Sequence, residues 1–150
     1  MRIQRSSELE QLAHEVHAAW ERGDDKWFSA HLSSDNPIML GSAPEEEMRG
    51  TDAVSVATAR EIANRDSYSF KPTAPRVIDA RESGDFGWAL VGTRWEFEDG
   101  SYIPVRGLTI FHREDGVWKA IIGLTAPAFS NELLRPGSPV AQVGHATVSA

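Results

Sequence analysis

The 150-residue sequence contains no cysteine. This absence excludes disulfide bonds, thiolate nucleophiles and cysteine-bound zinc. Positive charge is also scarce, because 15 Lys and Arg residues stand against 22 Asp and Glu, for a net charge of −7. Such a chain repels phosphate backbones and anionic membranes, and no local cluster of Lys and Arg offsets the repulsion. We therefore expect no nucleic-acid partner and no membrane partner.

Long apolar runs are missing as well. No stretch approaches the roughly 20 apolar residues of a membrane span, and the polar start MRIQRSSELEQLAHEV lacks the apolar centre of a signal peptide. We therefore expect a soluble, cytoplasmic protein. A length of 150 residues with 41% hydrophobic content fits one globular domain.

Helical patterns fill the first 64 residues. Ser7 and Glu10 predict a capping box, and apolar residues then recur at helical spacing until Gly23. Asp24 or Asp25 can cap a second, shorter helix. Residues 38–40 predict a short strand, residues 41–50 a loop, and a third helix begins at Thr51 and ends near residue 64.

The period of the pattern changes to two from residue 68 onward. Four extended segments follow, at residues 68–81, 86–98, 102–113 and 117–125, separated by turn signals. Helices followed by strands predict an α+β domain in which the helices cover one face of a curved antiparallel sheet. We place this domain at residues 1–130 and expect residues 131–150, which have little to bury, to form a mobile tail.

The order of these elements, together with MRGTDAV after the loop and EDGVW near the end, resembles the nuclear transport factor 2-like superfamily and within it the SnoaL-like group. The resemblance covers residues 9–129. It implies a cystatin-like cone with about three N-terminal helices on a strongly curved antiparallel sheet, a pocket between the concave sheet face and the first helix, and a homodimer. Because this fold hosts unrelated activities, it does not by itself name a reaction.

Ketosteroid isomerase is the best understood enzyme of the superfamily that the chain resembles. It needs a carboxylate base and two acidic hydrogen-bond donors. The family's donor carboxyl falls on Leu108, its tyrosine on Val16, and its base between Met39 and Gly41. None of these side chains can perform the role, so the chain is not expected to be a ketosteroid isomerase. If the chain is an enzyme, we expect a cofactor-independent isomerase, cyclase or dehydratase-type lyase.

The last two strands carry the main binding prediction. Many relatives end with Arg-x-Thr, Gly-Trp and His-x-His-x-Ser, and this pattern lies over the chain without a gap. It keeps Arg106 and Trp118, but its Thr falls on Leu108 and its two His fall on Ile122 and Leu124. Alternation then predicts an apolar inner wall. The predicted ligand-binding residues are Arg106, Trp20, Trp27, Met39, Leu108, Ile110, Trp118, Ile122 and Leu124.

Arg106 is the predicted anchor for an anionic or carbonyl group of a small lipophilic ligand, since its guanidinium suits such groups. The structural alternative is an ion pair with Glu96 or another carboxylate across the sheet. His112, near the last turn, and Glu96 are the candidate proton-transfer residues. The register of the turn at residues 98–101 leaves two possibilities for the inner face, either Arg94 and Glu96 or Thr93 and Trp95.

Metal and cofactor sites are not expected. His14 and His17 lie three residues apart on the first helix, but no third ligand has a recognisable spacing. The sequence therefore predicts no metal site and no cofactor.

Two hypotheses about function remain. In the first, the chain binds a small lipophilic molecule in an apolar pocket. In the second, it is a homodimeric assembly module whose outer sheet face carries the interface through Val105, Thr109, Phe111, Ile121 and Thr125.

Overall fold

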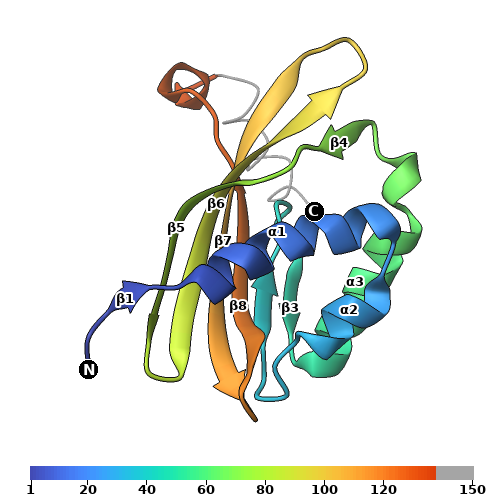
Figure 1. The fold of residues 1–150 in the computed structure, drawn as a ribbon. Coiled ribbons are helices and arrows are strands. Elements are labelled where there is room, and N and C mark those ends of the chain that lie inside the picture. The colour runs from blue at the N-terminus through green and yellow to red at the C-terminus, as the bar shows by residue number, and fades with distance from the viewer. Residues whose placement is uncertain (138–150) are drawn as a thin grey trace.

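The structure is a computed structural model that describes residues 1–137. Three helices lie on one face of a strongly twisted sheet (Figure 1). They are α1 (Ser7–Arg22), which crosses the sheet, α2 (Asp25–Ala30) and α3 (Thr51–Ala63). The predicted α+β architecture, with helices covering one face of a curved sheet, is confirmed.

Eight strands form one sheet in the described part of the chain. The main path runs in the order β1 (Gln4–Arg5), β5 (Arg76–Ser83), β6 (Phe86–Phe97), β7 (Tyr102–Glu114), β8 (Val117–Pro127), β2 (Ile38–Leu40) and β3 (Glu47–Arg49), and β4 (Phe70–Pro72) pairs with β6 beside this path. Short 3₁₀ turns occur at Arg65–Ser67 and Asn131–Leu134.

The sheet is mostly antiparallel, as predicted, but one pair of strands in the described residues makes it mixed. Strand β2 pairs in parallel with β8, with Met39 opposite Gly123, while the other strand pairs are antiparallel. Strands β2 and β8 are separated by most of the chain, so their relative direction depends on the whole topology. The local period of two carries no information about it.

Three local predictions also need correction. The predicted loop at residues 41–50 contains β3, and the two-residue strand β1 was not foreseen. The predicted extended segment 68–81 divides into β4 and β5. Residues 73–75, which include Pro75, separate the two strands. A proline lacks the N–H that a continuous strand would use, which accounts for a break at this place.

The helix caps follow simple backbone chemistry. The N-cap of α1 is Ser6 rather than Ser7, and its hydroxyl accepts a hydrogen bond from Leu9 N at 3.3 Å. Gly23 ends α1 in the left-handed conformation, with φ 70°. Of the two candidate caps of α2, Asp24 takes the position by accepting a hydrogen bond from Trp27 N at 3.1 Å.

Helix α1 rests directly on β5 and β6. A Cβ atom at Gly87 would overlap the Leu9 side chain, so the helix approaches the sheet as closely as a glycine allows. The buried core beneath it is a cluster of Leu9, Leu12, Ala13, Ala80, Ala89, Phe111 and Trp118. We call the side of the sheet that carries this cluster the helix-covered face and the opposite side the outer face.

Candidate functional site

The structure places the predicted wall of β7 on the outer face. Gly87 and Ala89 of the helix-covered face pair with Phe111 and Thr109. Phe111 is only 3% exposed, so the odd-numbered residues of β7 face the helix. The even-numbered residues therefore face outward. They are Arg106, which is exposed, and the half-buried Leu108, Ile110 and His112.

A β-bulge divides the predicted wall of β8. Ile110 pairs with Ile122 but Phe111 pairs with Ala120, so Ile121 is an extra residue. Trp118, which is 5% exposed, consequently belongs to the helix-covered face. Ile122 and Leu124, each 40% exposed, point outward. The assumption that alternation continues unbroken along β8 was wrong.

The turn between β6 and β7 settles the register that the sequence left open. Glu96 pairs with Tyr102, and Thr93 pairs with Val105, which is 2% exposed. Thr93 and Trp95 therefore share the helix-covered side, and Arg94 and Glu96 lie on the other. Within residues 1–137, neither Arg106 nor Glu96 forms a side-chain hydrogen bond or ion pair in the structure. The role of Glu96 in proton transfer stays a prediction.

The other three predicted wall residues lie on the side of the helices. Met39 sits against Gly123, where a Cβ would overlap its sulfur. Trp27 packs against the core cluster, and Trp20 is half-buried on α1. A ligand-binding role for these three residues stays a prediction.

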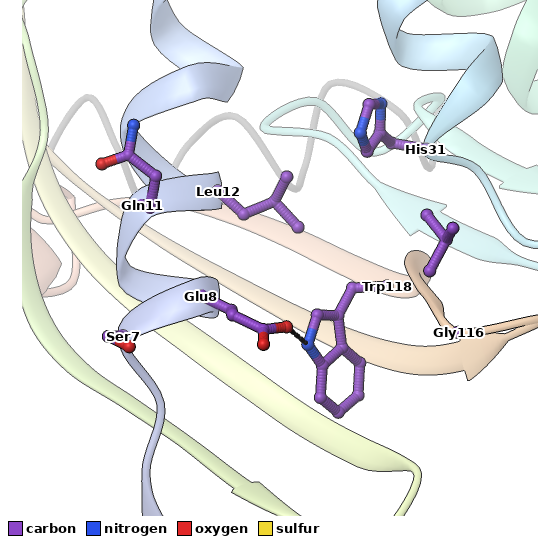
Figure 2. Close-up of a pocket in the computed structure, with 8 residues that line it drawn as sticks. Ser7, Glu8, Gln11, Leu12, His31, Gly116 and Trp118 are labelled. Atoms are coloured by element: carbon purple, nitrogen blue, oxygen red, sulfur yellow. Dashed lines mark hydrogen bonds between the residues drawn. The ribbon is translucent and has the colours of Figure 1, made fainter.

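An open groove lies between α1, the end of α2 and the turn from β7 to β8 (Figure 2). Its volume is ≈ 470 Å³, and its lining residues are Ser7, Glu8, Gln11, Leu12, His31, Gly116, Val117 and Trp118. Of these only Trp118 was predicted as a site residue. Glu8 and His31 belong to helix-end segments that are far apart in sequence, and no local motif joins them.

Glu8 fixes the tryptophan at the base of the groove. Its Oε2 accepts a hydrogen bond from Trp118 Nε1 at 3.0 Å (Figure 2). Arg113 Nη2 lies 3.5 Å from the same oxygen, and its guanidinium stands over the Trp118 ring at 4.1 Å. The buried indole is therefore satisfied, and the ring is held by one hydrogen bond and one cation–π contact.

His31 is fixed on the other side of the groove. Its backbone N–H donates to Trp27 O at 3.1 Å, its carbonyl accepts from Ala120 N at 2.7 Å, and its ring stacks on Trp27 at 4.0 Å. His31 Nδ1 lies 2.8 Å from Trp27 O. A carbonyl only accepts, so Nδ1 carries the hydrogen, and in the neutral ring Nε2 has a free lone pair.

The predicted catalytic residue His112 belongs to a separate cluster on the outer face. Its ring stacks on Phe86 at 4.7 Å, and its Nδ1 lies 3.7 Å from Glu114 Oε1 without a hydrogen bond. Glu114 accepts hydrogen bonds from Ser33 Oγ and Ser34 Oγ. The Ser33 hydrogen bond is the main cause that lowers the pKa of Glu114, against a smaller opposing effect of burial. A catalytic role for His112 stays a prediction.

Two features are absent from residues 1–137. These residues include no group of three or more His, Cys, Asp or Glu side chains arranged to hold a metal ion. Nor does any described helix have the length and apolar character needed to cross a membrane.

Comparison with known proteins adds the family. The model of the SnoaL-like domain matches residues 9–122, which is well over half of the chain. The chain belongs to the SnoaL-like family. No curated protein matches this SnoaL-like chain significantly.

Solved structures agree on the fold of the SnoaL-like chain. A nuclear transport factor 2-like protein of unknown function from Pseudomonas putida is 18% identical, with a TM-score of 0.67 over 86% of this chain and 90% of that one. A domain of unknown function with a cystatin-like fold from Nostoc punctiforme is 15% identical, with a TM-score of 0.66 over 96% and 97%. An uncharacterised protein with a cystatin-like fold from Caulobacter vibrioides is 18% identical, with a TM-score of 0.65 over 91% and 97%. The predicted cystatin-like fold is thereby confirmed.

Proposed function

We propose that this SnoaL-like domain binds a small molecule with an apolar body in the groove between α1, His31 and Trp118. The observation that carries the proposal is the groove itself, whose volume of ≈ 470 Å³ falls within the usual range of small-molecule sites. This position replaces the predicted one beside Arg106, because Arg106 lies on the outer face.

The lining of the groove supports this use. Leu12, Val117 and Trp118 supply apolar surface, and Glu8 and His31 supply polar atoms at its edge. The Trp118 ring is held by Glu8 and Arg113, and His31 is held through its backbone and its ring. Side chains fixed in advance lose little conformational freedom when a ligand arrives, which favours binding.

Nuclear magnetic resonance tests the proposal directly. The Trp118 indole N–H gives its own signal, and a panel of small lipophilic compounds should shift it together with the amides of Gln11 and Leu12. Gln11→Trp adds a large ring at the exposed edge of the groove and should abolish these shifts. Val56→Trp, at an exposed position of α3, is the matched control and should leave them unchanged.

The opposite results would end the proposal. Compounds that bind but leave the Trp118 signal in place, or shifts that persist in Gln11→Trp, would place the ligand elsewhere. A panel without any binder would remove the small-molecule function.

A second function, self-association, is favoured by the outer face. The exposed large apolar residues on this face are Leu40, Ile78, Phe86, Ile122 and Leu124, and half-buried Trp88, Leu90, Leu108 and Ile110 lie among them. A monomeric protein seldom exposes so continuous an apolar surface. The residues first predicted for the interface, such as Val105 and Phe111, are buried on the helix-covered face. The proposed homodimer therefore uses the alternate residues of the same strands, which lie on the outer face.

A further inference from the structure

The side-chain polar atoms of the groove that have no hydrogen-bond partner are mainly acceptors. In the neutral ring, His31 uses its Nδ1 hydrogen on Trp27 O and offers the Nε2 lone pair. Glu8 Oε2 receives Trp118 and Arg113, which leaves Oε1 available. Gln11 directs its amide nitrogen to Glu15 at 3.4 Å, so its carbonyl oxygen is the free atom. Only the Ser7 hydroxyl can serve in either direction.

The charge of the groove also favours a ligand that donates hydrogen bonds and carries no negative charge. None of the described lining residues is Lys or Arg. The nearest guanidinium, that of Arg113, already lies against the Trp118 ring and Glu8 Oε2. A net charge of −7 over the whole chain adds a long-range attraction for cations. A ligand carboxylate or phosphate would meet acceptors without a donor of opposite charge.

We infer that the ligand is a small primary amine that binds as its ammonium ion, with an alkyl or arylalkyl arm. This inference rests on the proposed small-molecule function of the groove. An ammonium group has three N–H donors and no acceptor, which suits a groove whose unpaired side-chain atoms, Glu8 Oε1 and His31 Nε2 among them, accept hydrogen bonds. Its apolar arm lies along Leu12, Val117 and Trp118. The bond to Glu8 is charge-assisted and supplies most of the selectivity.

Isothermal titration calorimetry with three probes of one shape tests the inference. The probes are 2-phenylethylammonium, neutral 2-phenylethanol and anionic 3-phenylpropionate. The ammonium should bind about tenfold more tightly than the alcohol, which corresponds to one charge-assisted hydrogen bond. The anion should bind more weakly than the alcohol.

Two variants assign the selectivity to its residues. Glu8→Gln retains a carbonyl oxygen for Trp118 Nε1 but removes the charge, and it should bring the ammonium down to the affinity of the alcohol. His31→Phe keeps a ring against Trp27 but removes Nε2, and it should weaken the ammonium severalfold while sparing the alcohol. Glu45→Gln makes the same charge change at an exposed loop position and should preserve the selectivity. Melting curves check that each variant is folded.

The failures are distinguishable. Equal affinity for ammonium and alcohol, or selectivity that survives Glu8→Gln, overturns the assignment of an amine while the groove keeps its proposed function. If none of the three probes binds and no compound of the lipophilic panel shifts the Trp118 indole signal, both the amine assignment and the proposed small-molecule function are overturned.

Discussion

Individual side chains hold the helices to the sheet through charge-assisted hydrogen bonds. Glu8 connects the first turn of α1 to Trp118 on β8, and Glu114 connects the end of β7 to Ser33 after α2. Each pair joins residues far apart in sequence, and each satisfies a group that burial would otherwise leave unpaired. Ser33 is completely buried, so its hydroxyl depends on Glu114 and on Asp35 N, from which it accepts a hydrogen bond at 3.0 Å.

Ser33→Ala should reduce the free energy of unfolding by about 2 kcal/mol near neutral pH, because a hydrogen bond to a charged group is lost. The pKa of Glu114 is lowered in the folded state, mainly by the Ser33 hydroxyl. The stabilisation is therefore complete above the ordinary glutamate pKa of about 4.3 and disappears as the pH falls through the lowered value. Urea unfolding at about pH 7 and about pH 3 measures the difference.

Glu114→Gln provides the control for this prediction. In that background Ser33→Ala should cost the same free energy at both pH values, because no carboxylate remains to titrate. An equal cost at both pH values in the wild-type background would show that the charge of Glu114 contributes nothing.

At the scale of elements, the sequence was informative wherever periodicity alone decides the structure. The three helices, the hairpin strands from residue 86 to residue 127 and the cap at Asp24 all follow from local patterns. Strand β3, by contrast, is three residues long and lies in a segment rich in glutamate, EEEMRG, so its pairing depends on β2 rather than on its own composition.

The candidate site was not predictable because one inserted residue changes the face of a strand. Side chains alternate with a period of two, so the extra Ile121 moves Trp118 inward relative to Ile122 and Leu124. The segment AIIGL at residues 120–124 contains only apolar residues that fit either face, and nothing in it marks the bulge. Which phase of β7 is buried was equally ambiguous, because Phe111 and Ile110 are both apolar. Burial under α1 decides between them.

At the scale of the whole molecule, the two faces of the sheet present different surfaces. The helix-covered face holds the core cluster, and the groove opens beside it, whereas the outer face presents the apolar surface proposed for the homodimer. The proposed ligand binding and the proposed self-association therefore use different surfaces, and substitutions on one should leave the other intact.

Leu124→Glu tests the separation. Leu124 is 40% exposed and pairs with Leu108 and Leu40 on the outer face, so a new carboxylate there should meet its symmetry mate in a homodimer. Light scattering after size exclusion should give twice the mass of the chain for the wild type and the mass of one chain for Leu124→Glu. Val56→Glu on α3 should remain dimeric. A monomeric wild type at micromolar concentration would contradict the proposed interface.

The central claim is that the groove beside Trp118 is the ligand site, and a crystal structure with 2-phenylethylamine bound tests it most directly. The account predicts the phenyl ring against Leu12, Val117 and Trp118, with the nitrogen within hydrogen-bonding distance of His31 Nε2 and Glu8 Oε1. An empty groove with the amine bound at another place, such as beside Arg106 on the outer face, would contradict it.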